Sequence, residues 1–179
     1  MISLAFFATA INYVDRQALS VAAPVLIDQF HMSNVTYSRV LFAFLLSYTI
    51  MNAVSGPVID RLGTKAGYAL CIAWWSASSI LHAFTRGALS LGVFRFLLGM
   101  GEAGNWPAAL KIVAEWFPER ERALASGLFN SGSSFGAILA PPLVAFIISR
   151  YGWSASFLLV GLFGFVWLIF WLKIYRTPA

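Results

Sequence analysis

Hydrophobic residues occur in long, nearly continuous runs along this chain, and short polar segments separate the runs. A run of about 20 apolar residues is the length that an α-helix needs to cross a bilayer. In lipid the backbone must satisfy its own hydrogen bonds, which leaves helices or closed barrels, and the runs lack the alternation of a barrel strand. The pattern predicts an all-α, polytopic membrane protein with six transmembrane helices, at about 3–28, 36–58, 66–84, 88–115, 122–148 and 154–174.

The composition strengthens this prediction and excludes other classes of protein. Hydrophobic residues make up 60% of the 179 residues and charged residues 11%, whereas a soluble domain carries about 25% charged residues. The net charge of +5 comes from basic residues scattered among short loops, so we expect no nucleic-acid partner. Cys71 is the single cysteine. Because no nucleophile–base pair or metal-ligand spacing occurs, we expect neither an enzyme nor a bound metal or cofactor.

The loops predict the orientation in the membrane, because basic residues collect on the cytoplasmic side. The loops after the second and fourth spans, together with the tail, contain Arg61, Lys65, Arg120, Arg122, Lys173 and Arg176. The connections on the other side contain only Arg39, Arg86 and Arg150. We therefore expect both termini to lie in the cytoplasm.

Four charged residues fall inside predicted spans. Asp15 and Arg16 lie in the first span, and Arg95 and Glu102 lie in the fourth. A charge at the centre of a bilayer costs about 2.5–3.5 kcal/mol on insertion scales, so such residues usually face a cavity on the path of an ion or a substrate. The alternative is a buried ion pair that fixes helix packing.

Helix geometry prevents these charges from neutralising each other within their own spans. Arg95 and Glu102 share a face but lie about 10 Å apart along the axis, and Asp15 and Arg16 point about 100° apart. Each charge therefore needs a partner from another helix, from water or from a ligand. We expect a central polar cavity.

The residue types suggest what the cavity binds. The guanidinium of Arg16 offers a planar fork that suits a carboxylate, and Tyr13 shares its helix face. Carboxyl groups that are removed from water can bind and release a proton near neutral pH. The pattern predicts proton-coupled transport of an organic anion. Further candidates for lining the cavity are Tyr48, Asn52, Asn130 and Ser133; Tyr48 could equally anchor helix packing.

The loop between the second and third spans, GPVIDRLGTKAG, resembles a signature of the major facilitator superfamily. Gly56, Asp60, Arg61 and Gly63 fall on its main positions, and Thr64 replaces a basic residue that is common there. The fourth span, RFLLGMGEAGNWP, is similar to a second motif of the superfamily. The resemblance implies that Asp60 and Arg61 belong to a cytoplasmic gate.

The segments NYVDR, WFPERERALASG and FNSGSSFGA resemble the anion:cation symporter branch, which includes bacterial sugar-acid carriers. The resemblance implies that Arg16, Tyr13 and Tyr48 contact the substrate. Within the bacterial members, the pattern is most similar to hexuronate carriers.

The same resemblance implies that Asp15 and Glu102 couple transport to protons and that Arg95 supports them. Two positions depart from the branch. Asn52 stands where many members have glutamine, and Ser133 stands where a galactonate-type carrier has glutamine. These departures leave the particular sugar acid open.

The superfamily normally has twelve spans in two halves, with the substrate between the halves. We expect residues 1–179 to form the amino-terminal six-helix half, with 3+3 inverted repeats, in a bacterial inner membrane. The first span begins almost at once after Met1, and the tail KIYRTPA follows the last span closely, so we expect a carboxy-terminal half to be missing. The predicted function is symport of a hexuronate or related sugar acid, driven by the proton gradient. The alternative is a non-transporting six-helix membrane protein that assembles with a partner half.

Overall fold

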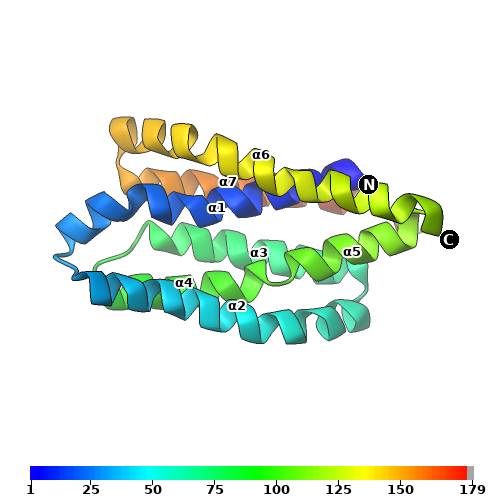
Figure 1. Ribbon diagram of the computed structural model, residues 1–179, viewed down its shortest axis with the longest axis horizontal. Helices are drawn as coiled ribbons and strands as arrows, with labels where there is room; N and C mark the ends of the chain where they lie inside the picture. The colour runs from blue at the N-terminus through cyan, green and yellow to red at the C-terminus, as the bar shows by residue number, and fades with distance from the viewer. Residues whose placement is uncertain (177–179) are drawn as a thin grey trace.

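The computed structural model describes residues 1–176, which form seven α-helices and no strand. The helices are α1 (Ile2–Gln29), α2 (Asn34–Leu62), α3 (Thr64–His82), α4 (Ala88–Glu102), α5 (Asn105–Trp116), α6 (Glu119–Tyr151) and α7 (Trp153–Ile174). The helices form an elongated bundle in which α1 and α3 run in the same direction, opposite to α2, and the two chain ends lie at the same end of the bundle (Figure 1). The predicted all-α fold is confirmed.

The stretch 88–115, which the sequence predicts as one helix, is divided into α4 and α5 at Ala103 and Gly104. Pro107 explains the break, because proline has no N–H to donate to the carbonyl four residues earlier and its ring clashes with that group. The carbonyl of Ala103 instead accepts a hydrogen bond of 3.3 Å from the hydroxyl of Ser55. The helix therefore stops directly after Glu102. Each of the other five predicted ranges corresponds to one helix, to within a few residues.

Glycines let the helices pack closely in pairs. The main pairs are α1 with α6, α2 with α4 and α3 with α7. A Cβ added at Gly132 of α6 would contact the carbonyl oxygen of Phe6, and one at Gly136 would contact that of Ala10. Small residues that let two helix backbones approach in this way are typical of helix contacts in membranes. These contacts fix α1, which carries Asp15 and Arg16, two of the four charges within the predicted spans.

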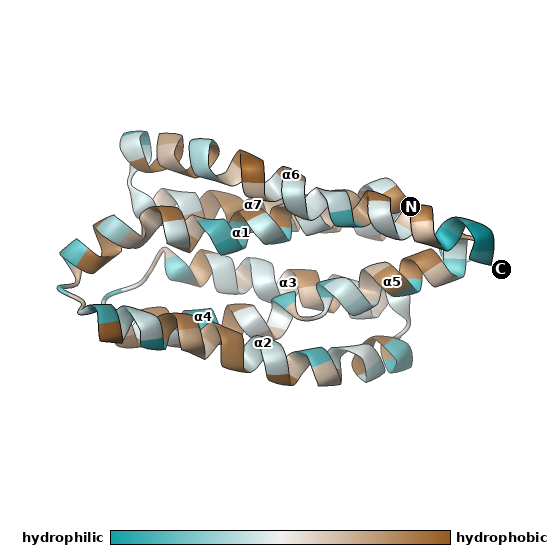
Figure 2. Ribbon diagram, viewed as in Figure 1, coloured by the Kyte–Doolittle hydropathy of each residue, from teal (hydrophilic) through white to brown (hydrophobic). Residues whose placement is uncertain are grey.

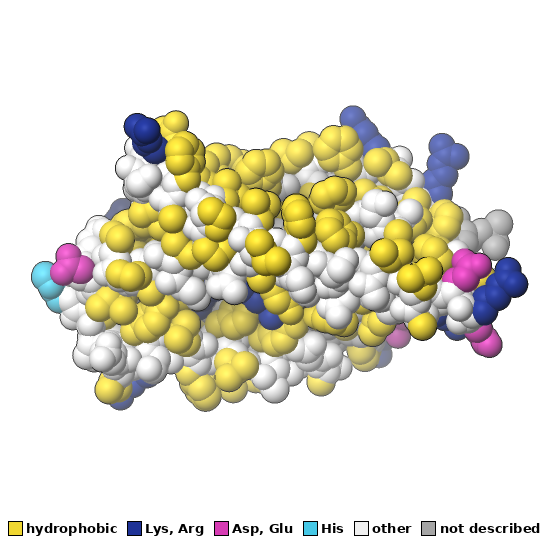
Figure 3. Space-filling model, turned by 45° about the horizontal axis from the view of Figure 1, so that its top comes forward, with side chains coloured by type: hydrophobic (Ala, Val, Ile, Leu, Met, Phe, Trp, Pro, Cys, Tyr) yellow, Lys and Arg dark blue, Asp and Glu magenta, His cyan; other side chains and the backbone are white. Residues whose placement is uncertain are grey.

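The outer surface suits a bilayer. By length and composition, α2, α6 and α7 are long and apolar enough to cross a membrane. The helices α4 and α5 are shorter, with 15 and 12 residues respectively. Hydrophobic residues recur along every helix (Figure 2). On the face in Figure 3, yellow side chains cover most of the length, and most charged side chains lie toward the two ends.

Candidate functional site

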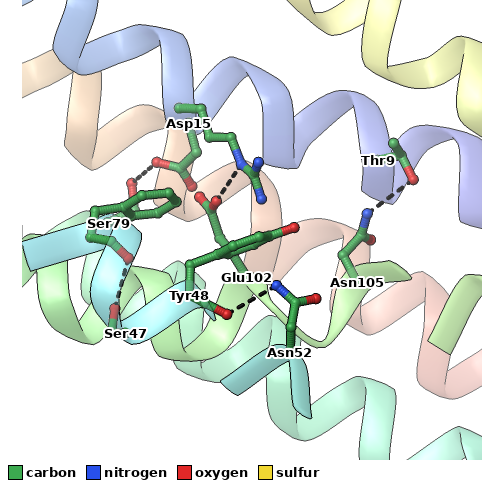
Figure 4. A network of polar contacts seen from close by, with 10 residues as sticks. Thr9, Asp15, Ser47, Tyr48, Asn52, Ser79, Glu102 and Asn105 are labelled. Atoms are coloured by element: carbon green, nitrogen blue, oxygen red, sulfur yellow. Dashed lines mark hydrogen bonds and ion pairs between the residues drawn. The ribbon is translucent and has the colours of Figure 1, made fainter. Parts of the chain in front are cut away.

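An ion pair joins the middle of α1 to the end of α4. The Nε of Arg16 donates a hydrogen bond of 2.7 Å to Oε2 of Glu102 (Figure 4). The Arg16 side chain is 25% exposed and the Glu102 side chain is fully buried. Glu102 reaches this position because α4 ends at it. Arg16 and Glu102 thus supply for each other the partner from another helix that each charge requires.

Three aromatic rings lie close to the guanidinium of Arg16. The guanidinium carbon lies 4.4 Å from the ring centroid of Tyr48, 5.3 Å from that of Tyr13 and 5.5 Å from that of Phe44. A cation over aromatic faces is attracted by their quadrupoles. The structure thus brings Arg16, Tyr13 and Tyr48 together. Phe44 was missed, although it precedes Tyr48 by one helical turn and stacks on it with centroids 5.6 Å apart.

Asp15 points into the interior of the bundle, away from the aromatic cluster of Tyr13, Phe44 and Tyr48. Its Oδ1 accepts a hydrogen bond of 2.6 Å from the hydroxyl of Ser79 in α3 (Figure 4). The hydroxyl of Ser79 also lies 3.2 Å from the carbonyl oxygen of Phe157 in α7. Asp15 is 1% exposed. Sequence reasoning missed Ser79, for which the only signal was a group of serines within an apolar run. The two neighbouring charges Asp15 and Arg16 therefore have different surroundings.

Arg95 is the second cation of the site and, unlike Arg16, it is buried. It is 3% exposed and lies 6.0 Å from the ring centroid of Phe44. Within residues 1–176, its Nε and Nη2 have no hydrogen-bond partner, and neither do Oε1 of Glu102, Oδ2 of Asp15 and Nη2 of Arg16. A buried charged group without full hydrogen bonding is costly. Two cations and two carboxylates with spare hydrogen-bonding atoms are therefore equipped to hold polar ligands, protons or water.

The remaining substrate candidates lie on α2 and α6 and bond locally. The side-chain amide of Asn52 donates a hydrogen bond of 2.9 Å to the backbone carbonyl oxygen of Tyr48. The hydroxyl of Ser133 donates one of 2.6 Å to the backbone carbonyl oxygen of Asn130. Among the described contacts, none joins these side chains to Arg16. The predicted substrate role of Asn52, Asn130 and Ser133 stays a prediction.

The predicted gate lies at the end of the bundle that holds the termini. Asp60 accepts a hydrogen bond of 2.6 Å from Nζ of Lys111, which joins α2 to α5. Gly63 links α2 to α3 with φ +78°, a conformation that favours glycine. Arg61 is exposed, and Gly56 lies within α2. Sequence reasoning missed Lys111, which is 51 residues from Asp60.

Comparison with known proteins gives the family of this fold and site. The sequence matches the Major Facilitator Superfamily over residues 5–179. It is 43% identical over 178 residues to a galacturonate transporter of Dickeya chrysanthemi, covering 99% of this chain and 52% of that protein. It is 39% identical to a hexuronate transporter of Escherichia coli (strain K12), covering 99% of this chain and 41% of that protein.

A solved structure shows the same fold. The crystal structure of a bacterial homologue of the human lysosomal transporter Spinster, in an inward-facing and occupied conformation, superposes with a TM-score of 0.86 at 22% identity. The match covers 99% of this chain and 44% of that one. This chain spans about half the length of the relatives that it matches. Both the family and these relatives are transporters rather than enzymes, and the chain belongs to the major facilitator superfamily.

Proposed function

We propose that this chain is the amino-terminal half of a proton-driven symporter for a sugar-acid anion of the hexuronate class. The names of the relatives support the substrate class. The observation that carries the proposal is the Arg16–Glu102 ion pair, in which a partly exposed cation is held by a fully buried acid. In such a pair, Arg16 can exchange the carboxylate of Glu102 for that of a substrate, and Glu102 can exchange the guanidinium of Arg16 for a proton.

The exchange works as follows. While Glu102 is ionised, it holds Nε of Arg16. A proton that reaches Glu102 removes its negative charge and weakens the pair, because a neutral partner attracts a guanidinium less than a carboxylate does. The fork of Arg16 then binds the carboxylate of the substrate beside the rings of Tyr13 and Tyr48. Release of the proton on the other side restores the pair and expels the anion.

Asp15 and Arg95 complete the charge balance. Asp15 is the second group that can hold the transported proton, and Arg95 offsets the negative charge of Asp15 and Glu102, near which it lies. With two cations and two carboxylates, the empty site is neutral, and one proton entering with one anion keeps it neutral. Rocking of the two halves of the protein exposes the loaded site to the inner side.

The proposed architecture has six spans, with α4 and α5 together forming the fourth. Both termini lie on the cytoplasmic side of a bacterial inner membrane, where the Asp60–Lys111 pair forms part of the gate. Support comes from the two chain ends at one end of the bundle (Figure 1) and from the basic loops. A carboxy-terminal half of six spans supplies the remaining substrate contacts. Since the relatives are transporters, the alternative of a non-transporting protein is not favoured.

The test is uptake of radiolabelled galacturonate and glucuronate by proteoliposomes that contain the full-length protein encoded by the gene. We expect accumulation when the outside is made acidic, and its loss on addition of a protonophore. Arg16→Ala should abolish uptake. Glu102→Gln should abolish accumulation while leaving exchange of internal for external substrate.

The matched control is Glu119→Gln, because Glu119 is an exposed carboxylate in the first turn of α6. Accumulation that survives the protonophore would refute proton coupling. Full uptake by Arg16→Ala would refute the role of the ion pair.

A further inference from the structure

Three buried polar side chains lie about one helical turn along the chain from the contact between Asp15 and Ser79. They are Asn12 of α1 and Trp75 and Ser76 of α3, which are 0%, 1% and 0% exposed. Within residues 1–176, both amide atoms of Asn12, Nε1 of Trp75 and Oγ of Ser76 have no hydrogen-bond partner. A polar group that is buried without a partner costs free energy. These side chains therefore require a partner that residues 1–176 do not supply.

The backbone places Asn12 and Ser76 at the same level of the bundle. The hydrogen bond between Asp15 and Ser79 ties α1 to α3, and the two helices run in the same direction (Figure 1). Asn12 and Ser76 each precede this contact by three residues, which is about 4.5 Å along each helix and on nearly the same face. The amide and the hydroxyl therefore lie one turn from the Asp15 carboxylate, toward the end that holds the termini.

The indole N–H of Trp75 lies near the hydroxyl of Ser76. A Cβ added at Gly164 of α7 would contact Oγ of Ser76 and lie 3.6 Å from Nε1 of Trp75. A Cβ added at Gly101, the residue before Glu102, would lie 3.0 Å from Cβ of Trp75. The indole of Trp75 thus begins beside Gly101 of α4 and points toward α7. Its N–H and the hydroxyl of Ser76 both lie next to Gly164 of α7.

We propose that Asn12, Trp75 and Ser76 form a binding site for water inside the bundle, next to Oδ2 of Asp15. A buried water molecule needs two to four polar partners, and these side chains offer an N–H donor, a hydroxyl and an amide. The site lies on the interior face of α1, whereas Arg16 faces the aromatic cluster of Tyr13, Phe44 and Tyr48. Protons and substrate therefore reach the charged centre by separate routes.

The role of this water rests on the proposed function. When Asp15 gives up its proton, the O–H bond of the carboxylic acid breaks and the proton passes to the water oxygen, which hands a proton on to the next water. No other reactant is needed. The charged groups that face Asp15 are Glu102 and Arg95 of α4 and its neighbour Arg16, and none of these is a member of the water site.

Two buried tryptophans provide a direct test of the water site. Short X-ray exposures generate hydroxyl radicals from bound water, and mass spectrometry then locates the oxidised side chains. Trp171 is the matched control, because it is 0% exposed and its Nε1 donates to the carbonyl oxygen of Lys65 at 2.9 Å. In the full-length protein we expect Trp75 to be oxidised several-fold faster than Trp171. Equal rates would overturn the proposal.

Two buried serines test the proton route. Ser76→Ala removes one partner of the water, whereas Ser156→Ala removes a hydroxyl that only donates to the carbonyl oxygen of Trp153 at 2.6 Å. We expect Ser76→Ala to lower uptake driven by a pH gradient about tenfold, the effect of one lost hydrogen bond, to slow oxidation of Trp75 and to leave substrate exchange unchanged. The control should leave all three unchanged.

The outcomes separate this inference from the proposed function. Unchanged uptake and unchanged Trp75 oxidation in Ser76→Ala would overturn the water site. Loss of exchange together with uptake would assign Ser76 a packing role and overturn the separate proton route. If the wild-type protein transports no sugar acid but Trp75 is oxidised rapidly, the water site stands and the proposed function fails.

Discussion

The hydroxyl of Tyr68 donates a hydrogen bond of 2.6 Å to the amide oxygen of Asn105, the first residue of α5. The amide nitrogen of Asn105 in turn donates to Oγ1 of Thr9 in α1 at 3.2 Å. All three side chains are buried. This chain of hydrogen bonds ties α1 and α3 to the break that follows Glu102, and it holds the end of α4 where Arg16 can reach it.

Tyr68→Phe should destabilise the protein, because it leaves the buried amide oxygen of Asn105 without its donor. We expect a loss of about 1–3 kcal/mol in the free energy of unfolding, measured by thermal unfolding in detergent. Tyr151→Phe is the control, since Tyr151 is 71% exposed. Equal effects of the two substitutions would show that the hydrogen bond to Asn105 contributes nothing.

Arg16→Lys should impair transport although it keeps the charge. Lysine lacks the planar fork that binds a carboxylate at two points and has a more strongly hydrated head group. We expect KM for the sugar acid to rise about tenfold, the effect of one lost charge-assisted hydrogen bond, as measured from the concentration dependence of uptake. Arg150→Lys at the exposed end of α6 should leave KM unchanged. An unaltered KM in Arg16→Lys would contradict a two-point contact.

Gly132→Ala should separate α6 from α1, because the added methyl group would contact the carbonyl oxygen of Phe6. Overpacking of this kind costs about 1–3 kcal/mol. A Cβ added at Gly127 of the same helix would have no atom within 4 Å. Gly127→Ala should therefore stabilise the protein by about 0.4–1 kcal/mol, because alanine lowers the conformational entropy of the unfolded chain. Unfolding temperatures of the two variants should therefore move in opposite directions.

Tyr175, just beyond α7, should make stability depend on pH in the alkaline range. Burial, together with the hydrogen bond of 2.6 Å to Glu115, raises the pKa of Tyr175 from 10.0 to about 12. The folded state favours the neutral phenol, so this stabilisation is complete below pH 10 and disappears as the pH rises through about 12. Over this range the wild-type protein should lose stability more steeply than Tyr175→Phe, as followed by thermal unfolding. Parallel curves would contradict the shift.

The helices were predictable because long apolar runs dominate this sequence. The break after Glu102 was not predicted, although Gly104 and Pro107 mark it, because the same residues also occur within continuous membrane helices. Whether Pro107 kinks a helix or ends it depends on a partner for the freed carbonyl of Ala103. That partner, Ser55, comes from another helix, and sequence periodicity carries no information about it.

The charged residues were predictable as a set, but not their pairing. Arg16 and Glu102 are 86 residues apart, so the pairing depends on how α1 and α4 pack. Periodicity correctly placed Tyr13 beside Arg16, since both lie on one helix. It could not show that Ser79 binds Asp15, because a serine in an apolar run commonly bonds to its own helix, as Ser78 does with the carbonyl oxygen of Trp74.

One peptide bond joins Asp15 to Arg16, and this has a mechanical consequence. The two side chains are fixed on a single rigid helix, with one held by Ser79 and the other by Glu102. Any rotation of α1 that turns Arg16 toward an incoming anion must also pull Asp15 away from Ser79. A rigid rotation of α1 thus couples the contacts of Arg16 to those of Asp15, without any change in the internal structure of the helix.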